Sequence, residues 1–154
     1  MNYTLQKELD VGGFGARWGC YATSLINIVE HELHRALTDK ELDEITGQWF
    51  RLRLVNMSNY KNHETAGANH LDPDRPGWDE DADPEWHWWV LNRRASLLIA
   101  MSICGIHNLI HEYETHILAT PGRHYVTYVV DENITINPDL SLRGKIIEKR
   151  RIEV

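Results

Sequence analysis

The sequence predicts an α+β fold in which helices come first and an antiparallel sheet follows. Apolar residues recur at three- and four-residue steps between positions 20 and 56, as is typical of amphipathic helices. After Gly105 the period changes toward two, and short turn sequences separate the apolar stretches, as in strands linked by hairpins. A length of 154 residues suits one domain with its own core, so we expect a single domain over residues 1–154.

Two helices are expected first, with Cys20 opening one that runs roughly to Leu37. Its apolar stripe consists of Tyr21, Leu25, Ile28, Val29, Leu33 and Leu37. The sequence TDKE predicts a capping box, in which Thr38 caps the second helix and Glu41 reaches back to the N–H of the cap. This second helix should fade near Asn56. Its predicted buried face consists of Leu42, Ile45 and Trp49.

Residues 57–83 are polar, acidic and proline-bearing, so we expect a long loop or insertion there. Asp83 and Pro84 suit the N-cap and first position of a third helix. That helix is expected to continue to about Cys104 and to stop at Gly105.

The C-terminal part reads as strands and turns. YETHILA (113–119) and HYVTYVV (124–130) alternate well enough to form strands, and TPGR forms the turn between them. DEN is a second turn that leads into ITIN (134–137), and KIIEKRRIEV (145–154) is the last expected strand. Its lysines and arginines are typical of a guarded sheet edge, which favours a monomer.

Composition excludes several classes of function. The net charge of −7 and the pI near 5.7 argue against nucleic-acid and membrane-surface partners. No apolar run approaches the roughly 18 residues that a membrane span needs. The N-terminal segment lacks the features of a secretory signal, and two cysteines are too few for a disulfide framework. We therefore expect a cytoplasmic protein, and no cofactor is indicated.

Cys20 stands at the first turn of a predicted helix, directly after Gly19. The unsatisfied N–H groups and the positive end of the helix dipole would stabilise a thiolate there. Gly19 would let a substrate backbone approach the sulfur. The position therefore suits a nucleophile, whereas Cys104 lies in an apolar run and is expected to be a small buried hydrophobe.

His124 opens one predicted strand and Asn137 ends the next. A turn of two or four residues between these strands would place position 137 opposite position 126, on the same face as His124 and one diagonal away. A three-residue turn would place Asn137 on the other face. The register of the hairpin therefore decides whether the two side chains meet.

The order of these three residues resembles the papain-like cysteine peptidase superfamily in its small bacterial form. The matching stretches are Gly19-Cys20, GRHYV (122–126) and Asn137-Pro138. The nearest well-known group is the leader peptidases of bacteriocin ABC exporters, and a small bacterial and phage-associated family with GCY/F early and HYV late is also similar. The resemblance covers roughly residues 15–56 and 105–154. It implies a papain-like fold with N-terminal helices packed against a C-terminal antiparallel sheet.

By this resemblance, Cys20 would be the nucleophile, His124 the general base and later the acid, and Asn137 the residue that orients the imidazole. Asp139 is the alternative orienting residue. The reaction implied is cleavage of an amide bond in a peptide or a peptidoglycan stem peptide. Beyond the triad, the expected cleft residues are Gly19, Trp18, Trp78 and Trp86.

The oxyanion of such a reaction needs hydrogen-bond donors, and the backbone N–H of Cys20 can supply one. The superfamily usually adds a glutamine about six residues before the cysteine, where this chain has Phe14. Gln6 is the nearest candidate and requires the VGGFG loop to fold back. This departure leaves open a catalytically inactive papain-fold protein, of phage or plasmid origin, that binds a host protein.

Metal sites are not expected, although the chain has nine histidines. HELH (31–34) and HEYETH (111–116) each miss the zincin motif by one residue, and we expect both on the solvated surface. DEDADPEWHWWV lacks the glycine and the final glutamate of a calcium loop. A metal-dependent hydrolase or metal-binding protein that uses the histidines of residues 107–116 remains a third hypothesis.

Overall fold

The computed structural model describes the chain except for residues 12, 17, 60–64, 67–85 and 121. Within these residues the helices are α1 (Cys20–Leu33), α2 (Asp39–Arg51) and α3 (Arg93–Ile103), with a 3-10 turn η1 (Gln6–Glu8). The strands are β1 (Asp10–Val11), β2 (Phe14–Gly15), β3 (Val55–Asn59), β4 (Thr65–Ala66), β5 (Trp86–Val90), β6 (Tyr113–Ala119), β7 (Arg123–Val129), β8 (Ile134–Ile136) and β9 (Lys145–Arg151). Helices combined with antiparallel sheets confirm the predicted α+β class.

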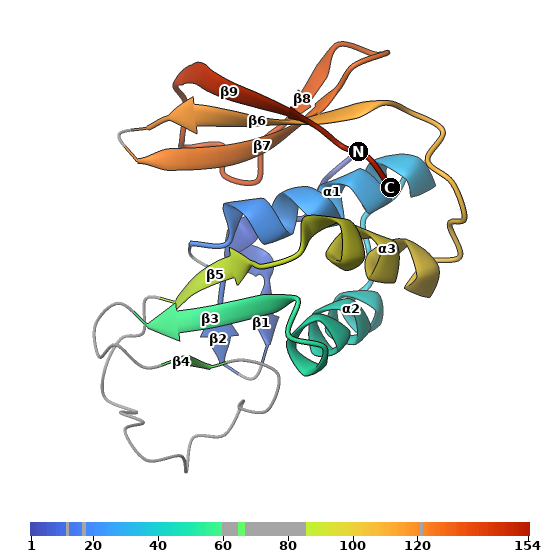
Figure 1. Ribbon diagram of the computed structural model, residues 1–154, viewed down its shortest axis with the longest axis vertical. Helices are drawn as coiled ribbons and strands as arrows, with labels where there is room; N and C mark the ends of the chain where they lie inside the picture. The colour runs from blue at the N-terminus through green and yellow to red at the C-terminus, as the bar shows by residue number, and fades with distance from the viewer. Residues whose placement is uncertain (12, 17, 60–64, 67–85, 121) are drawn as a thin grey trace.

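The α1 helix is the centre of the molecule, with the β6–β9 sheet on one side and α3, α2 and the small sheets on the other (Figure 1). Small polar side chains let α1 approach the sheet closely: Ser24 Oγ donates to the carbonyl of Tyr125 at 3.1 Å, and Thr127 Oγ1 donates to the carbonyl of Ser24 at 2.9 Å. None of the described helices has the length and apolar character needed to cross a membrane.

The α1 helix begins at Cys20 as predicted, but it ends at Leu33 and not at Leu37. His34 closes it in the left-handed conformation, with φ 56°. The predicted capping box of α2 is confirmed, because Glu41 N–H donates to Thr38 Oγ1 at 3.2 Å and Thr38 N–H donates to Glu41 Oε1 at 2.9 Å.

The segment after α2 differs from the prediction. The α2 helix ends at Arg51 because Val55–Asn59 pairs with β5 and with β4 in a three-stranded sheet. Most of the expected 57–83 loop lies outside the described residues.

The third helix is shorter than expected, and the prediction that it starts at Pro84 is wrong. Trp86–Val90 is strand β5, in which Trp86 and Trp88 are buried and Trp89 is exposed. The α3 helix begins only at Arg93, where Asn92 Oδ1 accepts the N–H of Ala95 at 3.0 Å. Pairing with β3 and a burial pattern of period two outweigh the local helical signal here. Gly105 stops the helix as predicted, with φ 73°.

The large sheet has the strand order β8-β7-β6-β9, and each neighbouring pair is antiparallel. The β6 strand matches its predicted bounds, and β9 lies at an edge as predicted. The β7–β8 turn spans the four residues 130–133, and Thr127 faces Ile136. This is one of the two registers that place Asn137 on the same face as His124.

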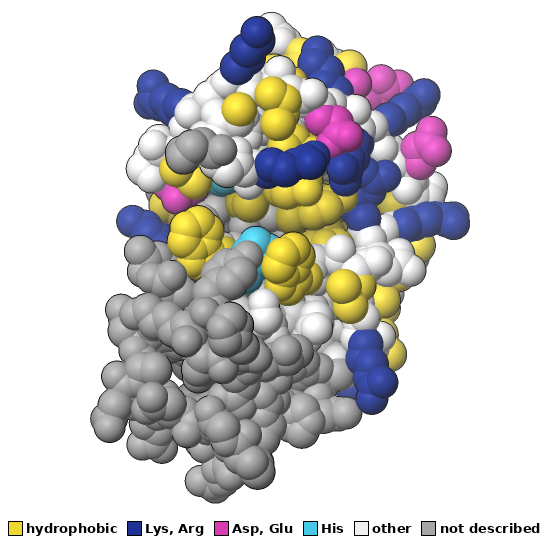
Figure 2. Space-filling model, turned by 60° about the vertical axis from the view of Figure 1, so that its left-hand side comes forward, with side chains coloured by type: hydrophobic (Ala, Val, Ile, Leu, Met, Phe, Trp, Pro, Cys, Tyr) yellow, Lys and Arg dark blue, Asp and Glu magenta, His cyan; other side chains and the backbone are white. Residues whose placement is uncertain are grey.

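Basic side chains gather on the surface of this sheet. On the face shown in Figure 2, lysine and arginine side chains gather over the sheet, above a hydrophobic band. Exposed residues of this group include Arg123, Lys145, Lys149 and Arg151. Residues 67–83 of the expected acidic loop lie outside the described residues.

Candidate active site

The β7 and β8 strands bring His124 and Asn137 into direct contact, with His124 Nε2 at 2.6 Å from Asn137 Oδ1. Two further bonds fix the orientation of the asparagine amide: Oδ1 accepts the N–H of Asp139 at 3.0 Å, and Nδ2 donates to the carbonyl of Leu142 at 2.8 Å. An amide oxygen can only accept, so His124 Nε2 carries its proton. Nδ1 therefore holds the lone pair that a general base needs.

Cys20 lies against the same strand. Its half-buried sulfur accepts the backbone N–H of Tyr125 at 3.5 Å, and Tyr125 directly follows His124. The rings of Tyr21 and Tyr125 stack in parallel with centroids 4.3 Å apart, which holds the start of α1 on β7. Among the hydrogen bonds of the described residues, none joins the sulfur directly to the imidazole. The backbone N–H of Tyr125 is what holds the sulfur next to His124.

Burial sets the protonation of both groups. It raises the pKa of the Cys20 thiol, while hydrogen bonds from backbone N–H groups, that of Tyr125 foremost, lower it, and the carboxylate of Asp139 raises it further. Burial also lowers the pKa of His124, against the raising effects of Asn137 and Asp139. Both directions favour a neutral thiol and a neutral imidazole over an ion pair. This outcome differs from the thiolate expected from the helix N-terminus, because desolvation outweighs the N–H groups.

Gln6 lies next to Pro138, which follows Asn137, despite its distance from them in the sequence. The hairpin of β1 and β2 folds the chain back, so that Ala16 N–H donates to the carbonyl of Leu9 at 2.8 Å. Gln6 N–H donates to the carbonyl of Pro138 at 2.9 Å, next to Asn137. The side chain of Gln6 is only 4% exposed. The glycine-rich loop thus makes the turn that the candidate oxyanion residue requires.

A cavity of about 600 Å³ lies beside these residues. Its lining includes Leu5, Gln6, Ala16, Pro138, Asp139 and Leu140. Gly19 N–H donates to the carbonyl of Ala16 at 2.9 Å, so the cavity adjoins the turn that leads into Cys20. An added Cβ at Gly19 would lie 2.8 Å from Cβ of Ala16, so this close turn requires glycine.

The expected cleft tryptophans have different surroundings. Trp18, which directly precedes Gly19, is 42% exposed. Backbone hydrogen bonds join it to Trp86 and Trp88 of β5. Trp86 is a core residue, 1% exposed, with its ring edge-on to Phe14 at 4.3 Å. Trp78 lies outside the described residues. Of the two that the structure describes, Trp18 is the one with exposed surface that a ligand could contact.

Comparison with known proteins does not assign the chain to a family. No protein-family model matches the chain, and searches of curated proteins and of solved structures found no match. A functional interpretation therefore rests on the residues themselves.

Sequence reasoning missed one residue that supports this site. Glu30 is fully buried in α1 and accepts hydrogen bonds from the N–H and hydroxyl of Thr4 at 2.9 and 2.8 Å, and from the N–H of Leu37 at 2.8 Å. Asn27 Nδ2 adds a bond at 3.0 Å. This carboxylate fixes the N-terminal segment that carries Gln6. The sequence does give one sign of this residue. Glu30 is a charged residue four positions after Ile26, and it therefore falls on an apolar side of the helix.

The prediction that both histidine clusters lie on the solvated surface is wrong for two residues. His31 is 4% exposed and His116 is 3% exposed, and each has a carboxylate partner. His31 Nε2 lies 2.9 Å from Glu132, and His116 Nε2 lies 2.9 Å from Glu114. Cys104 is half-buried at the end of α3, where burial and the carboxylate of Glu41 raise its pKa to about 11.

Proposed function

We propose that the protein is a cysteine hydrolase of the papain-like type that cleaves an amide bond. Cys20 is the nucleophile, His124 is the general base, and Asn137 orients the imidazole. The observation that carries this proposal is the 2.6 Å contact between His124 Nε2 and Asn137 Oδ1. The next residue of the strand, Tyr125, donates its backbone N–H to the sulfur of Cys20.

The neutral resting pair implies general-base catalysis. As the Cys20 sulfur attacks the carbonyl carbon, its proton passes to His124 Nδ1. The imidazolium that forms keeps its Nε2–H bond to Asn137 and lies near the carboxylate of Asp139. It then protonates the departing amine and leaves a thioester on Cys20. Water hydrolyses the thioester with His124 again acting as base.

The carbonyl oxygen becomes negative when the sulfur adds to it. The N–H of Cys20 is one donor for this oxyanion, and the side-chain amide of Gln6 is the second in our proposal. The hydrogen bond from Gln6 to the carbonyl of Pro138 at 2.9 Å supports this role, because it fixes Gln6 beside the triad. The substrate class is a peptide or a peptidoglycan stem peptide, with Trp18 at the rim.

The test is cleavage of peptide mixtures and muropeptides, read by mass spectrometry. Cys20→Ala and His124→Ala should abolish cleavage, whereas the matched control Cys104→Ala should keep it. Asn137→Ala should lower kcat about 10- to 100-fold, because general acid–base catalysis contributes about 10²–10⁴-fold and the base remains present but is no longer oriented. Full activity in Cys20→Ala would refute the mechanism.

A second candidate function is a papain-fold binding protein without catalytic activity. The raised pKa of the Cys20 thiol and the lack of a direct bond from its sulfur to the imidazole, within the described residues, favour it. Under this alternative no substrate is cleaved, and Cys20→Ala binds its partner as tightly as the wild type does.

A further inference from the structure

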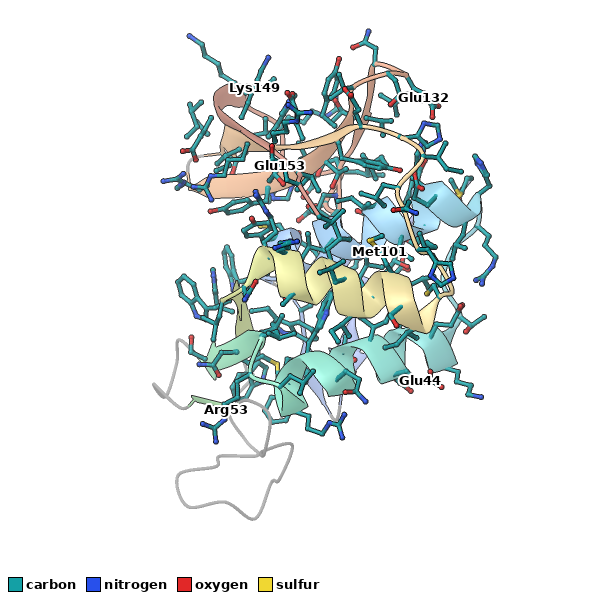
Figure 3. The ribbon with its side chains drawn as sticks, turned by 45° about the vertical axis from the view of Figure 1, so that its right-hand side comes forward. Glu44, Arg53, Met101, Glu132, Lys149 and Glu153 are labelled. Atoms are coloured by element: carbon teal, nitrogen blue, oxygen red, sulfur yellow. The ribbon has the colours of Figure 1, made fainter. Side chains whose placement is uncertain are left out.

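A second group of chemically competent side chains lies at the other end of α1. His31 Nε2 and His111 Nδ1 lie 2.9 and 3.0 Å from the same oxygen, Oε1 of Glu132, and the three ligand atoms are all within 4.8 Å of one another. Glu132 lies in the β7–β8 turn above the C-terminal end of α1 (Figure 3). At about 1.5 Å per helical residue, His31 is roughly 16 Å along α1 from Cys20. The group is therefore separate from the candidate active site.

We propose that this group, His31, His111 and Glu132, binds a divalent transition metal, with zinc as the best fit. Two imidazoles and one carboxylate form a donor set that zinc takes in proteins. With bonds of about 2.0–2.1 Å, a tetrahedral zinc holds its ligand atoms about 3.3 Å apart. The observed separations of 2.9 and 3.0 Å from the carboxylate oxygen need to open by only a few tenths of an ångström.

Neighbouring groups hold two of the three ligands in place. The Tyr3 hydroxyl lies 2.8 Å from Nδ1 of His31, on the side of the ring away from the site. Such a partner fixes the tautomer and the orientation of a metal-binding imidazole. The carboxylate of Glu32 accepts the N–H groups of Ile110 and His111 at 2.7 and 3.2 Å, and so fixes the backbone that carries the second imidazole.

The charge around the site suits a cation. Asp131 Oδ2 lies 2.7 Å from Nδ1 of His111, and its other oxygen accepts the N–H of Glu112 at 3.0 Å. Asp131, Glu132 and Glu32 thus bring three carboxylates to two imidazoles. The ring of His34 is centred 6.2 Å from that of His31, close enough to supply a fourth ligand after a rotamer change.

A bound metal would join three segments that are far apart in sequence: the end of α1, the connection before β6, and the β7–β8 turn. This turn leads directly into β8 and Asn137. The expected role is structural, with the metal fastening the hairpin of the sheet to the helix beneath it.

The experiment uses the full, untagged chain and titrates it with zinc in a calorimeter. We expect one zinc per chain. Binding should weaken by more than about tenfold in His111→Ala and Glu132→Gln, since even outer partners of a metal ligand contribute about 10- to 100-fold. The matched controls His107→Ala and Glu112→Gln replace exposed neighbours and should bind as the wild type does. Zinc should raise the Tm of the wild type and of these controls only.

Cobalt identifies the ligands in the wild-type protein, so the test does not depend on any variant folding. A d–d spectrum without a thiolate charge-transfer band supports the site. A thiolate band, or loss of binding in Cys20→Ser, would place the metal at a cysteine and overturn the proposal. Unchanged zinc binding in both His111→Ala and Glu132→Gln, or no binding by the wild type, would also overturn it. Absent binding, or binding that needs neither His111 nor Glu132, leaves the amide-cleavage proposal intact, because that proposal is tested by Cys20→Ala. A metal at Cys20 would count against both proposals.

Discussion

Burial predicts how fast the thiols of Cys20 and Cys104 react with iodoacetamide. A thiol with the ordinary pKa of about 8.5 is about 3% thiolate at pH 7. Burial raises the pKa of Cys20 above its usual value, so its thiolate fraction at pH 7 is smaller than this. Cys104, with a pKa of about 11, is about 0.01% thiolate at pH 7. Both thiols should therefore react slowly at neutral pH, each more slowly than a thiol with the ordinary pKa.

The assay is alkylation between pH 5 and pH 9 in a Cys104→Ala background, followed by intact mass. A neutral thiol predicts that the rate on Cys20 rises about tenfold per pH unit up to at least pH 8, because only the thiolate reacts. The Cys20→Ala variant reports the background rate of Cys104. A rate that stays high and constant below pH 7, and that falls in His124→Ala, would reveal a preformed thiolate–imidazolium pair. That result would refute the conclusion that burial outweighs the helix N-terminus.

Three further predictions concern stability. Thr38→Ala removes the cap of α2 and should lower the free energy of unfolding by about 1 kcal/mol in urea titrations; no change would mean that the capping box contributes nothing. Glu30→Ala leaves several buried donors without their acceptor and should lower it by about 3–5 kcal/mol, and a loss under about 1 kcal/mol would contradict this account. At Gly144 an added Cβ would lie 1.9 Å from the carbonyl oxygen of Ala119, so Gly144→Ala should cost about 1–3 kcal/mol in thermal melts. Its matched control Gly47→Ala fills open space on α2 and should stabilise by about 0.5–1 kcal/mol; equal effects of the two substitutions would count against the clash.

Where local chemistry decided the structure, the sequence was sufficient. Helix α1 begins at Cys20, Thr38 and Glu41 form their capping box, and β6 spans 113–119, as the patterns predict. Each of these features depends on neighbours within a turn or a hairpin, which the spacing of residues reveals. The contact between His124 and Asn137 is different, because the sequence left the hairpin register open and only the structure shows the four-residue turn that joins the two side chains.

Where a distant partner decided the structure, local patterns were not sufficient. Residues 86–90 carry a run of tryptophans that suits a helix or a strand, and pairing with β3 made them a strand. His31 is buried where it meets Glu132 from the β7–β8 turn, and His116 is buried where its ring stacks on Tyr128 of the neighbouring strand.

The sequence by itself thus determined the α+β class, the start of the cysteine helix, the edge strand and the residues that could form a triad. Only the tertiary structure decided that burial opposes ionisation of the thiol and the imidazole, that Gln6 lies beside Pro138, and that His31, His111 and Glu132 converge. The physical reason is how far apart in the sequence the interacting residues lie. Helix starts and turns are set by bonds between near neighbours, whereas desolvation and the meeting of remote side chains depend on every segment that packs around them.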